Sequence, residues 1–475
     1  MWRVKQIRQL LMIVVVILCF LTAAGIRANW QEQQKLISGD ANNYDYFGYS
    51  VSIDGDYAVV GARYSDIGGP YDNRGAAYIF KRTGTTWAQQ DKLAASDAQP
   101  GDSFGCSVSI SGDYAIVGAY TKDSHTGAAY IFERSGTNWS QQAKLTASDG
   151  AINDEFGYSV SISGDYAIVG AYGDTDMGKN QCGSAYIFEN PPTGWADTNE
   201  MVKLFAFDPG PTAGERFGYS VAIDANTVIV GADLSSPSPE LIWAGAAYIF
   251  IREGIYWNPQ HPKLIASDAS GGDNFGRAVA IDCNYAIVGA TGDDIDAVNG
   301  QTGCAYIFKH IDGPIWTEKD ILFASDPCKS DYFGSSVSII GDYAFVGAPA
   351  AFKPGAGYLY RRSGTNWPQL DKLTVLDVNS TDAFGCSVSI DSGYAVVGAY
   401  TDDSHGTAYT FEQICPTADL SNDCEVNFFD YAFFASWWLG SCSGPDWCSG
   451  ADLDQSTAVD FNDLDEFTLQ WLDYN

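Results

Sequence analysis

A pattern of alternating and continuous hydrophobic positions recurs seven times along the chain. In the first copy, polar and apolar residues alternate over 50–53, a polar break follows at 54–56, and residues 57–60 are apolar. Alternation predicts a half-buried strand, a continuous apolar run predicts a buried one, and the Asp-Gly pair between them favours a two-residue hairpin turn. A third apolar strand at 77–80 and a fourth beginning at Trp87 follow. Each unit therefore predicts one four-stranded sheet.

Two dipeptides mark the register of these units. Phe-Gly opens each copy, and Gly-Ala follows fourteen positions later without an insertion in any copy. The first dipeptide begins at Phe47, Phe104, Phe156, Phe217, Phe275, Phe333 and Phe384, and the second at Gly61, Gly118, Gly170, Gly231, Gly289, Gly347 and Gly398. Repeated four-stranded units are typical of a β-propeller, so we expect an all-β ring of seven blades.

One predicted strand lies out of order in this array. A segment like the fourth strand of a unit, from Trp30 to Leu36, precedes the first Phe-Gly, whereas the seventh unit ends at Phe411 without such a strand. Pairing the two ends in one sheet would close the ring and remove exposed strand edges. We therefore expect the N-terminal strand to complete the seventh blade.

The Phe-Gly dipeptide, the inner hairpin, the Gly-Ala dipeptide and the Ala-Tyr-Ile-Phe strand together resemble the FG-GAP repeat. The resemblance implies a seven-bladed β-propeller over residues 29–413, of the kind found in integrin α-chains and in many secreted bacterial proteins. In integrins some inner hairpins are expanded into Asp-rich calcium loops, whereas each copy here has a tight turn such as 163–165. We therefore do not expect integrin-type calcium sites in the ring.

Acidic residues gather on one predicted face of the ring. The loops that follow Gly-Ala differ in length and carry Asp66, Asp72, Asp123, Asp174, Asp176, Asp293, Asp294, Asp296, Asp402 and Asp403. The loops between blades carry aspartate pairs, namely Asp97 with Asp102, Asp149 with Asp154, Asp268 with Asp273, and Asp326 with Asp331. We expect the pairs to cap turns by accepting backbone N–H bonds, and the variable loops either to be equally structural or to bind a ligand or cation.

A separate duplication, with a shift of 33 residues, occupies the end of the chain. Each copy places oxygen-bearing side chains at positions 1, 3, 5, 9 and 12 of a loop, with a backbone carbonyl at position 7. These residues are Asp419, Ser421, Asp423, Glu425, Asn427 and Asp430 in the first copy, and Asp452, Asp454, Ser456, Ala458, Asp460 and Asp463 in the second. Because a hard cation needs several such oxygens around one point, both loops are predicted to bind Ca²⁺.

Each loop is followed by a predicted helix with aromatic residues at matching positions. The tandem copies, the final aspartate and the lack of a helix before each loop resemble a dockerin domain, which implies a small all-α module over residues 416–475. The resemblance also implies docking to a cohesin-like protein or to another surface or scaffold protein. Departures from the usual pattern at Cys424, at Thr457 and at 428–429 leave the type of partner open.

The first 28 residues predict export. Basic residues precede an apolar run from Leu10 to Ala24, the pattern of a signal peptide cleaved after Ala24 or Ala28. An uncleaved anchor is the alternative, but the run is short for a membrane span. We expect a secreted or cell-surface protein with no membrane span after cleavage. The net charge of -33 excludes nucleic acid as an expected partner, because such a chain repels phosphate backbones.

Export would place the cysteines in an oxidising compartment, where disulfides are permitted. A cluster near the C-terminus allows three pairings, and Cys442 with Cys448 is the first choice among Cys415, Cys424, Cys442 and Cys448. Cys106 and Cys386 occupy the same position of blades that are not neighbours. We expect these two to be small buried residues.

Little in the sequence favours catalysis, because the four histidines are dispersed and no nucleophile–base motif stands out. The favoured hypothesis is a secreted, non-catalytic binding, adhesion or assembly protein. Its loop face would bind a carbohydrate or protein ligand, and its dockerin-like tail would dock to a partner. A propeller enzyme that degrades polysaccharide, targeted by the tail, and a structural component of a surface layer are the alternatives.

Overall fold

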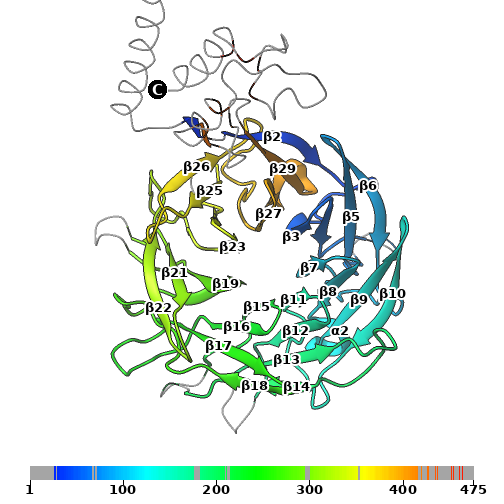
Figure 1. Ribbon diagram of the computed structural model, residues 1–475. Coiled ribbons are helices and arrows are strands. Elements are labelled where there is room, and N and C mark those ends of the chain that lie inside the picture. The colour runs from blue at the N-terminus through cyan, green and yellow to red at the C-terminus, as the bar shows by residue number, and fades with distance from the viewer. Residues whose placement is uncertain are drawn as a thin grey trace, which may run out of the picture. The chain divides into compact units, whose positions relative to one another are not determined.

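Seven four-stranded sheets surround a central opening in the computed structural model of the chain (Figure 1). The structure describes residues 26–27, 29–66, 69, 72–175, 182–208, 210, 214–294, 300–350, 354–415, 419, 425–426, 430, 434, 436, 451, 453, 459 and 463. No helix within these ranges is long and apolar enough to cross a membrane. The chain divides into two compact units, Glu32–Phe411 and the combination of Met1–Gln31 with Glu412–Asn475.

The first strand of each blade lies nearest the opening (Figure 1). Blade 1 consists of β3 (Phe47–Asp54), β4 (Tyr57–Ala62), β5 (Ala76–Thr83) and β6 (Thr86–Leu93), and blade 2 of β7 (Val108–Ser111), β8 (Tyr114–Ala119), β9 (Ala128–Ser135) and β10 (Asn138–Leu145). Blade 3 consists of β11 (Ser159–Ser163), β12 (Tyr166–Ala171), β13 (Ser184–Glu189) and β14 (Val202–Leu204), and blade 4 of β15 (Ser220–Asp224), β16 (Thr227–Ala232), β17 (Ala246–Glu253) and β18 (Tyr256–Pro259).

Three further blades complete the ring. Blade 5 consists of β19 (Phe275–Asp282), β20 (Tyr285–Ala290), β21 (Cys304–His310) and β22 (Trp316–Leu322), and blade 6 of β23 (Ser336–Ile340), β24 (Tyr343–Ala348), β25 (Ala356–Arg361) and β26 (Gln369–Leu373). Blade 7 consists of β27 (Val388–Asp391), β28 (Tyr394–Ala399), β29 (Thr407–Ile414) and β2 (Asn29–Leu36). Two short helical turns, α2 (Lys122–His125) and η2 (Asp402–Ser404), lie in the loops of blades 2 and 7.

The predicted ring closure is confirmed. In blade 7 the strand order is β2-β29-β28-β27, so the N-terminal strand supplies the outer strand of the last blade. Leu36 is 1% exposed and belongs to a core cluster that also contains Phe47 from blade 1 and Val396 from blade 7. The two ends of the ring are therefore joined both by strand pairing and by shared hydrophobic packing.

The hydrophobic core lies mainly between neighbouring blades. One cluster combines Val59 and Ile79 of blade 1 with Phe104, Val117 and Tyr130 of blade 2. Phe104, the phenylalanine of a Phe-Gly dipeptide, is fully buried there, with its ring centroid 5.6 Å from that of Tyr130. Because each blade presents one apolar face to the next, removing a blade would expose two such faces.

The repeated glycines allow adjacent blades to approach each other closely. A Cβ atom on Gly61 would lie 2.1 Å from the carbonyl oxygen of Gly105 in the next blade, and the same contact recurs at the Gly-Ala glycine of every blade. Gly105 has a φ of 92°, which side chains rarely tolerate. The Phe-Gly and Gly-Ala dipeptides therefore mark the two sides of one contact between blades.

Hydroxyl groups satisfy the open edges of the innermost strands. The amide groups of Val51 and Ile53 in blade 1 donate to the hydroxyls of Ser387 and Ser389 in blade 7, at 3.0 and 3.1 Å. Equivalent bonds join Ile110 to Ser52, Val160 to Ser107, Ile162 to Ser109, Ile223 to Ser161 and Ile390 to Ser338. An unpaired strand edge would otherwise leave amide groups without partners beside the opening.

The two propeller cysteines singled out in the sequence are unpaired, as expected. Cys106 is buried and Cys386 is half-buried, and their thiols approach the carbonyl oxygens of Gly157 and Gly48 in the next blade. Burial raises the pKa of Cys106 to about 11 and that of Cys386 to about 12, so both thiols keep their protons. They therefore replace the serine hydroxyl that makes this contact in blade 1, where Ser50 donates to Gly105.

The second unit contains the C-terminal residues. Here β1 (Ile26–Arg27) pairs antiparallel with β30 (Glu425–Val426). Asp430, Phe434, Ser436 and Asp463 are helical, but the predicted all-α module at 416–475 otherwise lies outside the described residues. The predicted signal peptide lies outside them too, except for Ile26–Arg27. Cys415 is disulfide-bonded, and the predicted Cys442–Cys448 pair is not among the described residues.

We predict that Leu36→Ala will destabilise the whole ring. The substitution removes buried methyl groups from the closure between blades 7 and 1, and such changes cost about 2–4 kcal/mol of unfolding free energy. Thermal unfolding followed by circular dichroism should show one lowered transition for the ring. Leu376→Ala is the matched control, because Leu376 is fully exposed. An unchanged melt for Leu36→Ala would show that the closure contributes little to stability.

Candidate functional site at the mouth of the central channel

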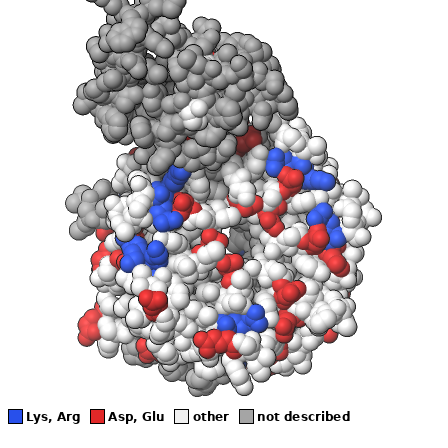
Figure 2. Space-filling model, in the orientation of Figure 1, with Lys and Arg blue, Asp and Glu red and all other residues white. Residues whose placement is uncertain are grey.

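The innermost strands enclose a channel, and the ring is hollowed at its centre in the space-filling view (Figure 2). At one mouth of this channel, the residue before every Phe-Gly has a left-handed backbone although none is glycine. These residues, with their φ values, are Tyr46 (57°), Ser103 (53°), Glu155 (58°), Arg216 (58°), Asn274 (57°), Tyr332 (53°) and Ala383 (55°). Such a conformation is unfavourable for residues with side chains, so each blade holds it by its surroundings. The backbone is constant here while the side chain differs between blades.

Tyrosines from five consecutive blades gather at this mouth. They come from three places in the repeat: next to the Phe-Gly dipeptide, directly after Gly-Ala, and one residue further on. We call Tyr46, Tyr49, Tyr64, Tyr120, Tyr158, Tyr172, Tyr219 and Tyr400 the tyrosine arc. All eight are half-buried, which leaves part of each ring accessible.

Close ring contacts make the arc continuous within two groups. In the first group, Tyr46 lies 5.1 Å from both Tyr64 and Tyr400, measured between ring centroids, and Tyr49 lies 5.4 Å from Tyr400. In the second group, the distances from Tyr158 to Tyr120, Tyr172 and Tyr219 are 5.4, 4.6 and 5.0 Å. These separations are typical of favourable aromatic pairs.

The two groups of the arc influence each other electrostatically. Tyr49 of blade 1 and Tyr158 of blade 3 interact electrostatically although blade 2 separates them in the ring. Burial raises the pKa of both phenols, so their hydroxyls remain protonated at neutral pH. The Tyr158 and Tyr219 hydroxyls are 2.9 Å apart and hydrogen-bond to each other. The mouth therefore presents neutral hydroxyl groups beside flat aromatic faces.

Guanidinium groups lie against both groups of the arc. The Arg63 guanidinium carbon is 4.0 Å from the ring centroid of Tyr49 and 4.5 Å from that of Tyr64. Arg277 lies 4.5 Å from Tyr219 and also forms a 3.1 Å ion pair with Asp233. Burial raises the pKa of Asp233 although Arg277 opposes the shift. A cation over an aromatic face is attracted by its negative charge density, so these contacts stabilise the arc.

The predicted role of the aspartate pairs is confirmed for the second member of each. Asp102, Asp154, Asp273 and Asp331 each accept a hydrogen bond from the backbone amide three residues earlier, and Asp45 and Asp382 do the same. These bonds hold the turn that leads into Phe-Gly, as an aspartate cap does elsewhere. The capping aspartates are therefore structural.

In three of the four pairs, the first aspartate binds both a buried tyrosine and a lysine. Asp97 accepts a 2.7 Å hydrogen bond from the Tyr130 hydroxyl and forms a 2.7 Å ion pair with Lys144. The same three residue types meet at Asp40, Asp149, Asp326 and Asp377. Burial alone would raise the pKa of Asp97. Lys144 and Tyr130 have the larger, opposite effect, so the pKa of Asp97 lies below its ordinary value. This Asp–Tyr–Lys contact was not predicted.

Blade 5 lacks the lysine of this contact. Ile321 pairs with Tyr306 in the register that Lys144 has with Tyr130 in blade 2. The Tyr306 hydroxyl still donates to Asp268, at 2.9 Å, and also to Asp293. Burial, with the charges of Asp293 and Asp268, raises the pKa of Asp273 to about 6. Blade 5 therefore concentrates carboxylates without the cation that the other blades supply.

Most described aspartates of the variable loops also bind within the protein. Asp66 accepts from the amide of Asn73, and Asp72 pairs with Arg74 at 2.7 Å. Asp174 accepts from Tyr186, and Asp402 accepts from Thr407 and Tyr409. Asp176 and Asp296 lie outside the described residues. These contacts favour the structural interpretation of the acidic loops over the ligand-binding one.

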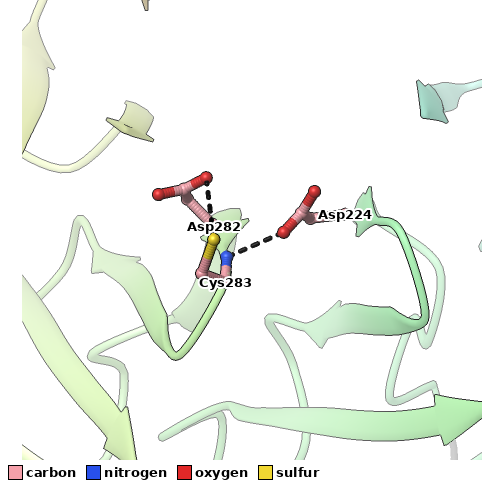
Figure 3. Close-up of side chains that lie close together, drawn as sticks. All are labelled: Asp224, Asp282 and Cys283. Atoms are coloured by element: carbon pink, nitrogen blue, oxygen red, sulfur yellow. Dashed lines mark hydrogen bonds between the residues drawn. The ribbon is translucent and has the colours of Figure 1, made fainter. Parts of the chain in front are cut away.

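Charged side chains lie in small mixed groups over the face of the ring in Figure 2, with most Lys and Arg beside Asp or Glu. The turns of the inner hairpins add a group of Asp224, Asp282 and Cys283, whose ligand atoms lie within 4.8 Å of one another (Figure 3). The Asp224 carboxylate accepts from the amide of Cys283, and Asp282 accepts from the amide of Gly341 in the next blade. Both carboxylates thus join successive blades, as Asp54 does with Gly112.

The structure describes four of the twelve predicted calcium ligands. Asp419 is half-buried, Glu425 lies in β30, and Asp430 and Asp463 are fully buried and helical. The other eight, namely Ser421, Asp423, Asn427, Asp452, Asp454, Ser456, Ala458 and Asp460, lie outside the described residues. Asp430 and Asp463 hold position 12 of their respective loops, so this position is helical and buried in both copies.

The sequence interpretation missed the tyrosine arc. Members from different blades are at least 38 residues apart in the sequence, and only the ring brings them to one mouth. A signal was nevertheless present, because Tyr49, Tyr158 and Tyr219 all directly follow Phe-Gly, while Tyr120, Tyr172 and Tyr400 directly follow Gly-Ala. Positions of the same type in five neighbouring blades must converge in a propeller.

Comparison with known families gives one match. A family model described as the FG-GAP repeat matches the chain seven times, over residues 30–80, 87–132, 139–188, 198–250, 258–308, 316–360 and 367–411. The matches cover each blade from its outer strand to the third strand of the next, which agrees with the observed repeat. No curated protein matches the chain.

We predict that Ile321→Lys will lower the pKa of Asp273 and stabilise blade 5 at neutral pH. The raised pKa means that the folded state binds this proton more tightly than the unfolded state, so the contribution is lost as pH rises through about 6. A lysine would favour the charged form and add about 1 kcal/mol at pH 7.

Thermal unfolding at pH 4.5 and pH 7 tests this expectation. Ile321→Lys should gain more stability at pH 7 than at pH 4.5, whereas the neutral control Ile321→Met should show no such difference. Equal effects of the two substitutions at both pH values would contradict the assignment.

Proposed function

The chain belongs to the FG-GAP repeat family, and we propose on this basis that its ring is a non-catalytic binding module whose ligand contacts the mouth of the central channel. The tyrosine arc is the observation that carries the proposal. Tyrosine provides a large, rigid contact area with a polar tip at low cost in conformational entropy, which suits it to recognition. The arc is thus the part of the ring best suited to hold a ligand.

The position of the arc supports a binding role over a purely structural one. The structural features of the repeat, such as the glycine contacts and the buried tyrosines of the third strands, recur in all seven blades. The arc does not recur: the positions that hold Tyr172 and Tyr219 in blades 3 and 4 hold Pro349 and Ser335 in blade 6. A blade therefore folds without an aromatic residue at these positions.

The asymmetry of the mouth favours a ligand that lies to one side of the channel. Blades 7, 1, 2, 3 and 4 supply the tyrosines of the arc. At the positions directly after Gly-Ala and directly after Phe-Gly, blades 5 and 6 supply Thr291, Arg277, Pro349 and Ser335. Loops carried on a rigid scaffold are where recognition usually resides. A carbohydrate or an extended peptide segment would fit such a surface, since both combine polar groups with packing area.

We further propose that the protein is exported and that residues 416–475 form a calcium-dependent docking module. The N-terminal pattern of basic and apolar residues supports export. Oxygen-bearing side chains at matching positions of the two loops support cation binding, because a hard cation needs several such oxygens around one point. When bound, Ca²⁺ would be held by the twelve predicted ligands and would order the two loops. The ring and the tail would then have separate binding roles.

We predict that replacing two arc residues will abolish ligand binding without unfolding the ring. The double variant Tyr158→Ala with Tyr219→Ala removes the centre of the second group and its hydroxyl pair. On an array of neutral and acidic glycans and peptides, binding by the wild-type chain should be lost or weakened at least about tenfold in this variant. Tyr256→Ala is the control, because Tyr256 is 68% exposed at the start of β18.

Equal array signals from the double variant and the wild type would place the binding surface elsewhere. Release of reducing sugar from a bound glycan would instead favour the polysaccharide-degrading alternative. A preserved melting temperature in the double variant is required for either comparison.

We predict that Ca²⁺ will raise the thermal stability of the full chain through its C-terminal residues. A ligand that binds only the folded state stabilises it in proportion to its concentration over Kd. The gain should disappear in the variant Asp430→Asn with Asp463→Asn, but not in the control Asp403→Asn, which alters an exposed aspartate of the ring. Melting curves that are the same in calcium and in chelator would contradict the calcium assignment.

A further inference from the structure

Arg63 differs from the other arginines of the ring in its surroundings. Polar partners bind Arg74 (Asp72), Arg82 (Asp56), Arg134 (Asp113), Arg252 (Asn226), Arg277 (Asp233) and Arg362 (Asp342). Arg63 lies instead over the rings of Tyr46, Tyr49 and Tyr64, and no ion pair links it to a carboxylate within the described ranges. In a chain with 59 acidic and 26 basic residues, an arginine without an acidic partner is unexpected.

The guanidinium of Arg63, which has five N–H donors, makes no hydrogen bond to a described protein group. Its Nε is buried without a partner, as are those of Arg82 and Arg134, but these two arginines bind Asp56 and Asp113 through Nη2. Leaving such a donor unpaired is unfavourable unless another group binds there in the functional state. The planar fork of the guanidinium is suited to pairing with a carboxylate through two parallel hydrogen bonds.

The tyrosine hydroxyls next to Arg63 also lack hydrogen bonds to described protein groups. Among the described residues, the side chains of Tyr46, Tyr49, Tyr64 and Tyr400 show no hydrogen bond to a protein group, whereas Tyr158 and Tyr219 bond to each other. None of the four hydroxyls is both fully buried and unpaired, so each retains some contact with solvent. The first group of the arc thus offers several accessible hydroxyls around one unused guanidinium.

Three arginines contact the arc although the chain is strongly acidic. They are Arg63, Arg216 and Arg277, of which Arg277 pairs with Asp233, while Glu155 bonds to Tyr172. The chain as a whole carries -33. A ligand with a single carboxylate would be attracted here, whereas a highly acidic one would be repelled by the rest of the protein.

We propose that Arg63 and the surrounding tyrosines form a subsite for the carboxylate of an acidic sugar, such as a uronic acid within an otherwise neutral oligosaccharide. The inference rests on the proposed function, for which it names the class of ligand. Arg63 would bind the carboxylate, the tyrosine hydroxyls would pair with sugar hydroxyls, and the half-exposed rings would cover the apolar face of the sugar. An acidic peptide would use Arg63 but would leave most of these hydroxyls unpaired, so the sugar uses more of the site.

Calorimetric titration of the full chain with a disaccharide that carries one glucuronic acid, and with the methyl ester of the same disaccharide, tests the proposal. The wild type should bind the acid at least about tenfold more tightly than the ester, because only the acid forms a charged pair. Arg63→Met should bind both forms as weakly as the wild type binds the ester. Arg63→Lys, which keeps the charge but loses the fork, should restore part of the preference.

Arg82→Met is the matched control. Arg82 also stacks on a tyrosine, with its guanidinium carbon 3.8 Å from the ring centroid of Tyr394. Unlike Arg63, it forms an ion pair, with Asp56 in the turn between β3 and β4. This variant should keep the preference for the acid. If Arg63→Met fails to fold, Tyr49→Phe removes one hydroxyl and should weaken both forms equally, and the comparison of acid with ester in the wild type still decides.

Equal binding of acid and ester by the wild type, or a preference that survives Arg63→Met, would overturn the proposal. Binding of neither disaccharide, or of an acidic peptide in their place, would overturn it as well. The proposed function fails separately, only if the double variant of Tyr158 and Tyr219 leaves array binding unchanged. A neutral glycan bound at the mouth would therefore support the proposed function and refute the role of Arg63.

Discussion

Close contact between successive blades at a glycine is the constraint on which the rest of the ring depends. With a Cβ atom at Gly61, the backbone of the next blade would have to move, because the carbonyl of Gly105 would lie only 2.1 Å away. This closeness brings the serine hydroxyls of one innermost strand within reach of the amides of the next, and it places Phe104 in a core shared with blade 1. Since the ring is closed by β2, a displacement at one contact must be taken up by the others.

Much of this architecture could be predicted from the sequence because its determinants are local or strictly periodic. The tight turn at Gly55 depends on neighbouring residues, and the cap that Asp102 provides spans three positions. Ring closure followed from counting strands, since a fourth strand at 30–36 preceded the first unit and the last unit lacked one. The spacing of the repeats and the residues of their turns were therefore sufficient to predict the seven-bladed ring. The calcium loops of the tail remain a prediction of the same kind.

The chemistry of the mouth could not be predicted in the same way. The Asp–Tyr–Lys contact joins Asp97 to Tyr130, which is 33 residues away and belongs to another part of the repeat. The many aspartates of the variable loops left ligand or cation binding there as an open prediction. Most of the described ones instead bind other groups of the ring. Strand patterns show which residues are buried, but they do not show that Tyr49 and Tyr158, from separate blades, come close enough to interact electrostatically.

Differences between equivalent positions carry the functional information in such a ring. Arg63, Tyr120, Asp233 and Pro349 all directly follow Gly-Ala, so the same backbone accepts a cation, a phenol, an anion and an imino acid. Blade geometry cannot require any one of them. Arg63 departs from most of the other arginines in that no described carboxylate pairs with it, and the folding of the ring gives no reason for this departure. The proposed ligand supplies such a reason, because its carboxylate would pair with a guanidinium that the described part of the ring leaves without an acidic partner.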